Sequence, residues 1–276
     1  MKRLLVFIII LVTGCTRFAL EAKRMPSPPP PVPPVEPLML QRVEKDKKCE
    51  QWVDSVFNRM SLTERIGQLF IYTIAPQQSK ANKELLRRVV KEYKVGGLLF
   101  SGGLMQNQAI LTNDAQQMAD VPLMVTFDGE WGLSMRLRGT PVFPKNMILG
   151  CIQDDELIYE YGREMARQCR ELGVRVNFAP VADVNINPHN PVINTRSFGE
   201  SPVNVANKVI AYAKGLQDGG VLSVCKHFPG HGDTDVDSHK ALPMLSFTRE
   251  RLDSIELYPF KKAINAGLDG IMVGHQ

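Results

Sequence analysis

The chain has 276 residues, of which 44% are hydrophobic and 22% are charged, with a formal net charge of +4. This length and apolar content support one sizeable core and exclude two ordinary domains joined by linkers. The small net charge and the lack of a long basic run in the sequence disfavour nucleic acid as a partner.

The first 15 residues have the order of a bacterial export signal. Lys2 and Arg3 form a basic start, and residues 4–12 form an apolar run. This run is shorter than the roughly 20 residues that a membrane-spanning helix needs. Residues 12–15 (VTGC) resemble a lipobox, which implies lipidation of Cys15 and a protein of the cell envelope anchored to a periplasmic or outer membrane. The alternative is a plain signal peptide cleaved elsewhere, with Cys15 incidental.

Residues 16–45 are predicted to form a proline-rich tether. Residues 26–37 contain eight prolines, which favour an extended polyproline II segment with a rise of about 3.1 Å per residue. Such a segment is either a stiff spacer or a proline-rich ligand for a partner domain. Directly after a lipid anchor we favour the spacer, and we expect residues 46–276 to form the folded domain.

The folded part contains four further cysteines: Cys49, Cys151, Cys169 and Cys225. Export would permit disulfides, but the sequence leaves their pairing open. The spacings match no zinc-binding pattern. Apolar residues surround Cys151, Cys169 and Cys225, which predicts buried free thiols at these three positions.

Apolar residues at helical spacing alternate with short apolar runs along the folded part. A helix over residues 52–60 marks the beginning of the core near Cys49, and a capping box at residues 61–64 begins a second helix. Six strands are predicted at residues 69–74, 96–100, 123–127, 174–178, 221–225 and 270–273. Helices are predicted at residues 85–93, 106–118, 157–172 and 205–216, and in a last stretch that Pro259 interrupts and Gly267 ends.

This alternation predicts an α/β fold with a parallel sheet, either a (β/α)8 TIM-type barrel or an open doubly wound sheet. No Gly-x-Gly-x-x-Gly turn follows the first strand, which argues against a dinucleotide-binding sheet. Polar residues gather where strands end, at Asp128, Asp183, Lys226, His227 and His275. We favour the barrel, because its strand ends converge on one active-site face. Six strands do not close an eight-stranded barrel, so we expect the barrel to be C-terminally incomplete in this chain.

The loop after the fifth predicted strand, residues 226–239, reads KHFPGHGDTDVDSH and concentrates the polar residues of the chain. One alternative is a metal site built from His227, His231, Asp233 and His239. That spacing fits no familiar set of ligands, and the sequence implies no metal or organic cofactor. A solvated loop without a function is a second alternative.

Acid-base catalysis is the favoured interpretation of this loop. Asp237 and His239 flank one residue, so both side chains can point to the same side of an extended segment. A carboxylate beside an imidazole fixes the tautomer of the ring and stabilises its protonated form. His239 is therefore predicted to act as a general acid and then as a general base.

This loop, followed by Leu242 and Pro243, resembles the signature of glycoside hydrolase family 3, in the branch of bacterial β-N-acetylglucosaminidases. Three further segments agree in order: residues 127–136 (FDGEWGLSMR), 177–185 (NFAPVADVN) and 194–199 (NTRSFG). The resemblance extends from about residue 61 to the last residue, and the fold of the family is a (β/α)8 barrel.

The resemblance implies roles for individual residues. Asp237 and His239 match the acid-base dyad of the family. Five residues match positions that bind the hydroxyls of N-acetylglucosamine: Asp128, Arg136, Arg196, Lys226 and His227. Family members more often have Glu-Gly-Gly where this chain has EWG at residues 130–132, so a structural role for Arg136 stays open. The variant resembles a subgroup in which the barrel can be fused to a further C-terminal domain.

Retaining glycosidases commonly use two carboxylates. The resemblance implies a nucleophilic aspartate near the end of the seventh strand, which Asp269 does not match, so we expect the nucleophile beyond Gln276 and this chain alone to be inactive. The implied activity is retaining hydrolysis of terminal non-reducing β-linked N-acetylglucosamine, from cell-wall-derived or other glycans. The alternatives are a non-catalytic sugar-binding lipoprotein, and a β-glucosidase or phosphorylase of the same family.

Overall fold

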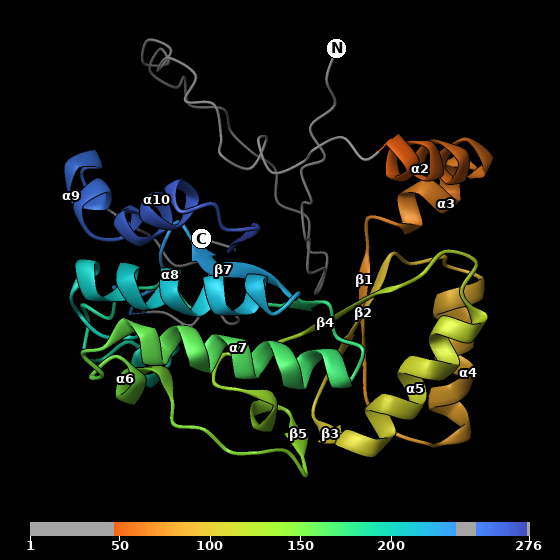
Figure 1. Cartoon of the computed structure of the whole chain (residues 1–276), viewed down its shortest axis with the longest axis horizontal. Helices are drawn as coiled ribbons and strands as arrows, with labels where there is room; N and C mark the ends of the chain where they lie inside the picture. Colours follow the sequence, from red (N-terminus) through yellow and green to blue (C-terminus); the bar gives the residue numbers. More distant parts are fainter. Residues whose placement is uncertain (1–46, 236–246, 275–276) are drawn as a thin grey trace.

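The computed structural model of the protein describes residues 47–235 and 247–274 (Figure 1). Its centre is a six-stranded sheet in the order β1-β2-β4-β6-β7-β8. The strands are β1 (Ile71–Ile74), β2 (Gly97–Phe100), β4 (Met124–Phe127), β6 (Val176–Asn177), β7 (Leu222–Phe228) and β8 (Gly270–Val273). All six predicted strands are confirmed. β7 extends further than predicted and includes Lys226 and His227.

The strand order of the sheet is the order of the strands along the chain. Each strand pairs in parallel with the next, for example Leu98 with Val125 and Thr126 with Val176. A doubly wound sheet reverses its strand order near the middle, whereas a (β/α)8 barrel keeps it. The predicted barrel topology is therefore confirmed, and β1 and β8 are the two edges of this sheet in the described part of the chain.

The predicted helices are present between the strands. The longer ones are α2 (Lys47–Arg59), α4 (Lys80–Lys91), α5 (Met105–Met118), α7 (Asp155–Glu171), α8 (Pro202–Asp218) and α10 (Leu257–Asn265). The shorter ones are α3 (Leu62–Gly67), α6 (Asn146–Leu149), α9 (Arg249–Ser254) and the 3-10 helices η1 (Leu133–Met135) and η2 (Asn194–Arg196). In Figure 1, α7 and α8 lie side by side, and α4 and α5 form a second pair. No helix within residues 47–235 and 247–274 is long and apolar enough to cross a membrane.

Short polar side chains fix the start of several helices. The predicted capping box is confirmed: the Ser61 backbone N–H donates to Glu64 Oε2 at 2.8 Å, and the Glu64 N–H donates to Ser61 Oγ at 3.3 Å. Ser79 caps α4 and Ser201 caps α8 without the reciprocal bond: each side chain accepts a backbone hydrogen bond from the third residue that follows.

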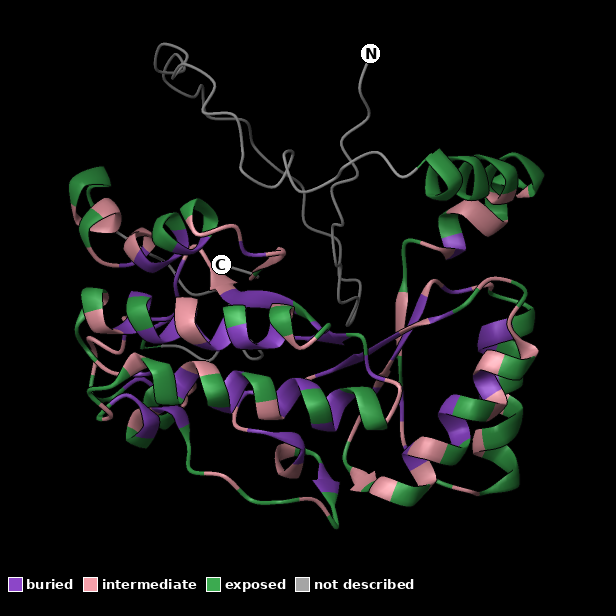
Figure 2. Cartoon of the chain, in the orientation of Figure 1, coloured by how far each residue is buried: buried purple, intermediate pink, exposed green. Residues whose placement is uncertain are grey.

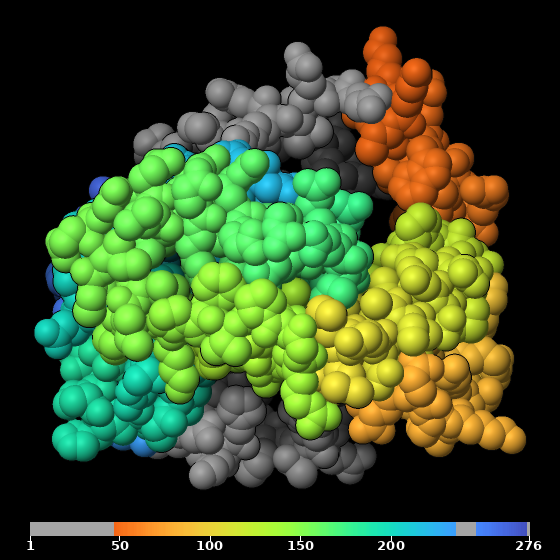
Figure 3. All heavy atoms as spheres, turned by 60° about the horizontal axis from the view of Figure 1, so that its bottom comes forward, coloured from red at the N-terminus to blue at the C-terminus, as the bar shows by residue number. Residues whose placement is uncertain are grey.

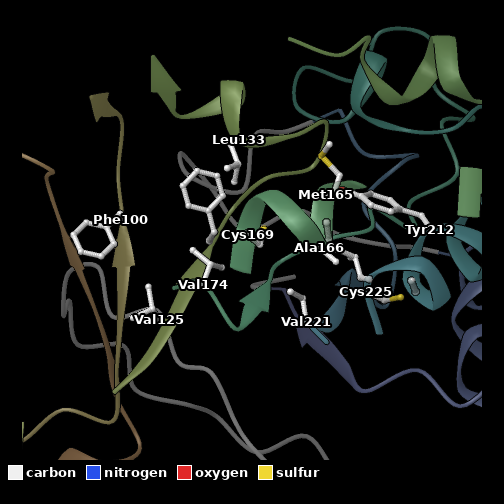
Figure 4. Packing of buried hydrophobic residues seen from close by; sticks show 14 of the residues in the cluster. Phe100, Val125, Leu133, Met165, Ala166, Cys169, Val174, Tyr212, Val221 and Cys225 are labelled. Carbon is white, nitrogen blue, oxygen red and sulfur yellow. The ribbon is translucent and has the colours of Figure 1, made fainter. Parts of the chain in front are cut away.

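Alternate residues of each strand point to opposite faces of the sheet, so each face carries an apolar cluster. The larger cluster lies between the sheet and its helices. Leu98, Val125 and Phe127 are fully buried in the large cluster under the helices, where Figure 4 shows Val125 near Cys169 and Val174. Val176, Phe178 and Val224 form a second, smaller cluster, against which Leu99, Met124, Ile71 and Met272 pack. These residues occupy the sheet face that corresponds to the interior of a barrel.

The amphipathic helix α2 does not begin the core. It contains no buried residue, and the side chains of Trp52 and Phe57 are 51% and 41% exposed (Figure 2). The expectation that the core begins near Cys49 is therefore wrong. The apolar stripe is real, but within the described residues most of it is exposed, and only Val56 and Met60 are half-buried.

Two smaller expectations also need correction. Cys169 and Cys225 are buried free thiols as predicted, whereas Cys151 is exposed in the turn after α6, where its Sγ lies 3.5 Å from the carbonyl oxygen of Met147. Pro259 lies in the first turn of α10, where a missing backbone N–H has no helical partner to lose. The helical stretch breaks earlier, at residues 255–256 between α9 and α10.

A two-stranded parallel sheet that the sequence did not predict joins the loops after β2 and β4. It pairs β3 (Gly103–Leu104) with β5 (Leu137–Arg138), and the Gly103 N–H donates to the carbonyl oxygen of Arg136 at 3.0 Å. In the space-filling view the yellow residues at the start of α5 abut the yellow-green residues that follow β4 (Figure 3). This pairing fixes the backbone of Arg136.

Candidate active site

The predicted sugar-binding residues come from separate segments and meet at the carboxyl end of the sheet. Asp128 follows β4 directly, and Lys226 and His227 lie near the end of β7. Arg136 follows η1, and Arg196 is the last residue of η2. The structure brings all five into one network of hydrogen bonds and ion pairs.

Asp128 is bound by two cations. Its Oδ1 pairs with Lys226 Nζ, and its Oδ2 pairs with Arg136 Nη2. Burial alone would raise the pKa of Asp128, but the charges of Lys226 and Arg136 outweigh it and hold this pKa well below its usual range. Asp128 is therefore a carboxylate at neutral pH, and Arg136 belongs to the same charge network as Lys226.

Glu130 lies at the bottom of the site and is fully buried. Its carboxylate accepts two hydrogen bonds from Arg196, from Nε at 2.9 Å and from Nη2 at 2.6 Å, and lies 2.8 Å from Lys226 Nζ. Burial would raise the pKa of Glu130, but Lys226 and Arg196 reverse the shift and lower it. Burial would lower the pKa of Lys226, and the two carboxylates raise it instead. Lys226 therefore stays an ammonium although its side chain is only 3% exposed.

Asp183 orients His227. The Nδ1 of His227 lies 2.7 Å from Asp183 Oδ2, and the Nε2 lies 3.3 Å from Arg196 Nη2. Since Arg196 can only donate, a neutral ring fits with its proton on Nδ1 and its Nε2 accepting. Asp183 is fully buried, and its Oδ1 also accepts the backbone N–H of His231 at 2.8 Å. Burial would raise the pKa of Asp183, but these contacts with His227 and His231 lower it.

Glu130 and Asp183 are site residues that the sequence did not assign. Asp183 was visible as a polar residue at a strand end, and Glu130 lies two residues after Asp128. Alternation along an extended segment would have placed Asp128 and Glu130 on one side. Their partners, however, lie 44 and 66 residues away in the sequence, so only the fold identifies these contacts.

The segment that leads to the predicted dyad is held by the loop after β6. Asn190 Nδ2 donates to the carbonyl oxygen of His231 at 2.7 Å, and Asn187 Nδ2 donates to Asp235 Oδ1 at 2.5 Å. A Cβ at Gly232 would lie 1.8 Å from the carbonyl oxygen of Val184, so only glycine fits there. Asp237 and His239 themselves lie outside the described residues, as does Cys15.

The alternative of a metal site gains no geometric support from the described part of the loop. His231 Nδ1 lies 3.0 Å from Thr234 Oγ1, and Asp233 Oδ2 accepts a hydrogen bond from Arg251 at 2.8 Å. Among residues 47–235 and 247–274, no three His, Cys, Asp or Glu side chains converge as metal ligands.

The site has a buried floor and a partly exposed rim. Glu130, Asp183 and Lys226 form the floor, and the rim consists of Asp128, Arg136, Arg196 and His227, whose side chains are between 20% and 40% exposed. The Asp128 carboxylate of the rim can accept hydrogen bonds and the guanidinium groups of Arg136 and Arg196 can donate them, and the buried charges below hold these groups in place. Such a surface can bind a ligand that carries several neighbouring hydroxyl groups.

Comparison with known proteins identifies the family of the chain. Residues 61–276 match the family described as "Glycosyl hydrolase family 3 N terminal domain". The chain belongs to this family of glycosidases, and its α/β fold with a parallel sheet in barrel order is the fold that the solved relatives share.

Three similar proteins illustrate the match. "Beta-hexosaminidase A" of Pseudoalteromonas piscicida is 38% identical over 204 residues, which are 69% of this chain and 34% of that protein. "Beta-hexosaminidase LpqI" of Mycobacterium tuberculosis is 37% identical over 196 residues, which are 68% of this chain and 49% of that protein. The solved family 3 β-N-acetylglucosaminidase of Paenibacillus sp. str. FPU-7 has a TM-score of 0.73 and 40% identity, over 78% of this chain and 42% of that chain. The chain thus spans half the length of these relatives or less.

Proposed function

We propose that the protein hydrolyses terminal non-reducing β-linked N-acetylglucosamine residues, with retention of configuration, in cell-wall-derived or other glycans. The observation that carries the proposal is the network at the sheet end, in which Asp128, Arg136, Arg196 and His227 present donors and acceptors to solvent above buried charges. The names of the relatives, which are β-hexosaminidases and a β-N-acetylglucosaminidase, support the same substrate class.

The chemistry of the rim suits a sugar. Vicinal hydroxyls can donate to one carboxylate and accept from neighbouring cations, and hydrogen bonds to charged groups contribute about 1.5–3 kcal/mol each. Asp128 accepts, and Arg136 donates from the other side of the same ion pair. Lys226 has three donors, of which the contacts with Asp128 and Glu130 use two, so one more can point to a ligand.

For the chemical step, we propose that His239 protonates the leaving oxygen while Asp237 orients its ring. The sequence motif supports these roles. The described base of the loop is consistent with them, because Asn187 and Asn190 hold residues 231–235 against the loop after β6. We further propose a lipid anchor at Cys15 and a location in the cell envelope, which rest on the lipobox-like sequence alone. Incorporation of labelled fatty acid by the wild type and not by Cys15→Ser would support the anchor, and equal labelling would refute it.

The site is tested by sugar binding. In an NMR titration we expect N-acetylglucosamine to bind more tightly than glucose, and Arg136→Ala to weaken its binding roughly 10- to 100-fold, through loss of a charged hydrogen bond. The matched control is Arg138→Ala, two residues along the same segment, where the arginine is exposed outside the network. Equal losses in the two variants, or no binding of N-acetylglucosamine by the wild type, would contradict the proposal.

A further inference from the structure

Gly129 lies between the two carboxylates that hold Lys226, and two side chains bind its backbone. The Gly129 N–H donates to Asn177 Oδ1 at 3.0 Å, and Asn177 Nδ2 donates back to the Gly129 carbonyl oxygen at 3.2 Å. The Tyr212 hydroxyl donates to the same oxygen at 3.1 Å. The Gly132 backbone N–H also donates to this oxygen at 3.4 Å, so two side chains and one local turn hold the polar groups of Gly129.

The side chain of Asn177 forms the hydrogen bonds that a further pair of strand residues would otherwise form. The β4–β6 ladder pairs Phe127 with Asn177 and ends there, because the chain turns after Phe127. The side-chain amide of Asn177, which carries both a donor and an acceptor, then takes the place of the next strand residue. Gly129 is itself buried, so an unpaired backbone group there would be costly.

Tyr212 reaches Gly129 from α8 because α7 and α8 approach closely. A Cβ at Gly162 would lie 2.4 Å from the carbonyl oxygen of Tyr212, and a Cβ at Gly215 would lie 2.2 Å from that of Tyr159. The Tyr212 ring lies beside Met165 (Figure 4) and is fully buried. Burial raises the pKa of Tyr212 well above its usual value, so the hydroxyl stays protonated and donates.

Asp128 and Glu130, which flank Gly129, need a backbone that is held in place. Asp128 and Glu130 both contact the single ammonium of Lys226, and each also pairs with an arginine. These contacts require the two carboxylates to keep their spacing on a segment that is no longer part of a strand. Binding sites must hold their geometry within about 0.5 Å, which a loop achieves only with a supporting shell.

We infer that Asn177 and Tyr212 are positioning residues, which fix Asp128 and Glu130 against Lys226 through the Gly129 peptide and so set the affinity of the site for a sugar. The inference rests on the proposed function for the nature of the ligand, but the positioning of Asp128 can be measured without any ligand.

The test compares Tyr212→Phe and Asn177→Ala with Tyr161→Phe in the whole chain. Tyr161 belongs to the same aromatic cluster, with its ring centroid 5.0 Å from that of Tyr212, but does not contact Gly129. Affinity for N-acetylglucosamine is measured by NMR titration. The pKa of Asp128 is measured from its ¹³C carboxyl shift, assigned with Asp128→Asn, and folding is checked by the denaturant midpoint.

We expect Tyr212→Phe to weaken sugar binding about fivefold, Asn177→Ala roughly tenfold or more, and Tyr161→Phe by no more than about twofold. In the first two variants the pKa of Asp128 rises toward its usual value, because the carboxylate moves away from Lys226 and Arg136. A purely structural role would lower the midpoint and leave this pKa unchanged.

The two hypotheses fail in different ways. If the wild type binds no N-acetylglucosamine, the proposed function is contradicted, and the titration of Asp128 still decides on the positioning role. If Asp128 titrates in Tyr212→Phe and Asn177→Ala as in the wild type, the positioning inference is wrong, whether or not the sugar binds. If Asn177→Ala does not fold, Tyr212→Phe, which loses only a hydroxyl, decides alone.

Discussion

At the scale of residues, acidic and basic side chains alternate in the site, and each stays charged because an oppositely charged neighbour binds it. Lys226 is buried and stays charged because Asp128 and Glu130 surround it, and Glu130 stays charged because Arg196 binds it in two places. A buried charge without its partner is strongly destabilising. Single substitutions in the floor should therefore affect folding, and those in the rim should affect ligand binding.

A substitution at Asp183 tests whether the floor of the site stabilises the fold. Asp183→Asn should lower the free energy of unfolding by about 1–3 kcal/mol, because the amide keeps one acceptor oxygen but turns an NH2 group toward either the His227 ring N–H or the His231 backbone N–H, which leaves a buried donor unpaired. Denaturant unfolding measures the change. Asp54→Asn, on the exposed face of α2, is the control and should change stability by no more than about 0.5 kcal/mol.

The same residue predicts a dependence on pH. The pKa of Asp183 is lower in the folded protein than in the unfolded chain, so its stabilising contribution is complete above about pH 4 and is lost as the pH falls through the folded pKa. We expect the difference in stability between wild type and Asp183→Asn to shrink in this acid range. A constant difference from pH 7 to pH 3 would contradict the assignment.

His239 tests the proposed chemistry. His239→Ala in the whole enzyme should slow the hydrolysis of a substrate with a poor leaving group by about 10²–10⁴-fold, because that oxygen needs a proton as it departs. An aryl glycoside with an activated leaving group needs no such proton and should lose far less. Kinetics on both substrates measure the ratio, and equal losses would argue against a general acid at this position.

At the scale of elements, the loops after the strands place the functional groups, and contacts between loops hold them. The β3–β5 pair fixes Arg136, and the loop after β6 holds residues 231–235. Neither contact was predictable from local sequence. A two-residue strand has no period to detect, and Asn187 and Asn190 read as ordinary loop residues, whereas the six strands were predictable from their continuous apolar runs.

Gly232 is the most confined point of these loop contacts. A Cβ there would lie 1.8 Å from the Val184 carbonyl oxygen, so Gly232→Ala should displace the loop and cost on the order of 1–3 kcal/mol of stability, as over-packing does. Gly102→Ala is the control, because its Cβ would meet only the Arg136 carbonyl oxygen at 3.4 Å. Equal unfolding midpoints for the two variants would contradict the predicted confinement.

At the scale of the whole molecule, the sequence predicted the barrel order of the strands but misjudged the edge of the core. Periodicity identified α2 as amphipathic, but it cannot show what covers an apolar stripe. The five residues that the family resemblance implies lie together in one network. The contacts of Glu130 and Asp183 in that network became evident only from the fold, because their partners are distant in the sequence.

The core boundary can be measured with two aromatic residues. Phe100, at the end of β2, is 1% exposed and Trp52, on α2, is 51% exposed. Phe100→Ala should lower the free energy of unfolding by about 3–5 kcal/mol, and Trp52→Ala by no more than about 0.5 kcal/mol. Similar losses for the two substitutions, measured by denaturant unfolding of this chain, would show that α2 is part of the core.

We propose above all that the charge network at the carboxyl end of the sheet binds N-acetylglucosamine, and that the protein hydrolyses its β-linkage with retention of configuration. The most direct measurement follows the hydrolysis of 4-nitrophenyl N-acetyl-β-D-glucosaminide by ¹H NMR, with the protein expressed from its complete coding sequence. We predict that the β-anomer of N-acetylglucosamine is the first product, before mutarotation. Failure to release 4-nitrophenol, or release of the α-anomer first, would contradict the claim.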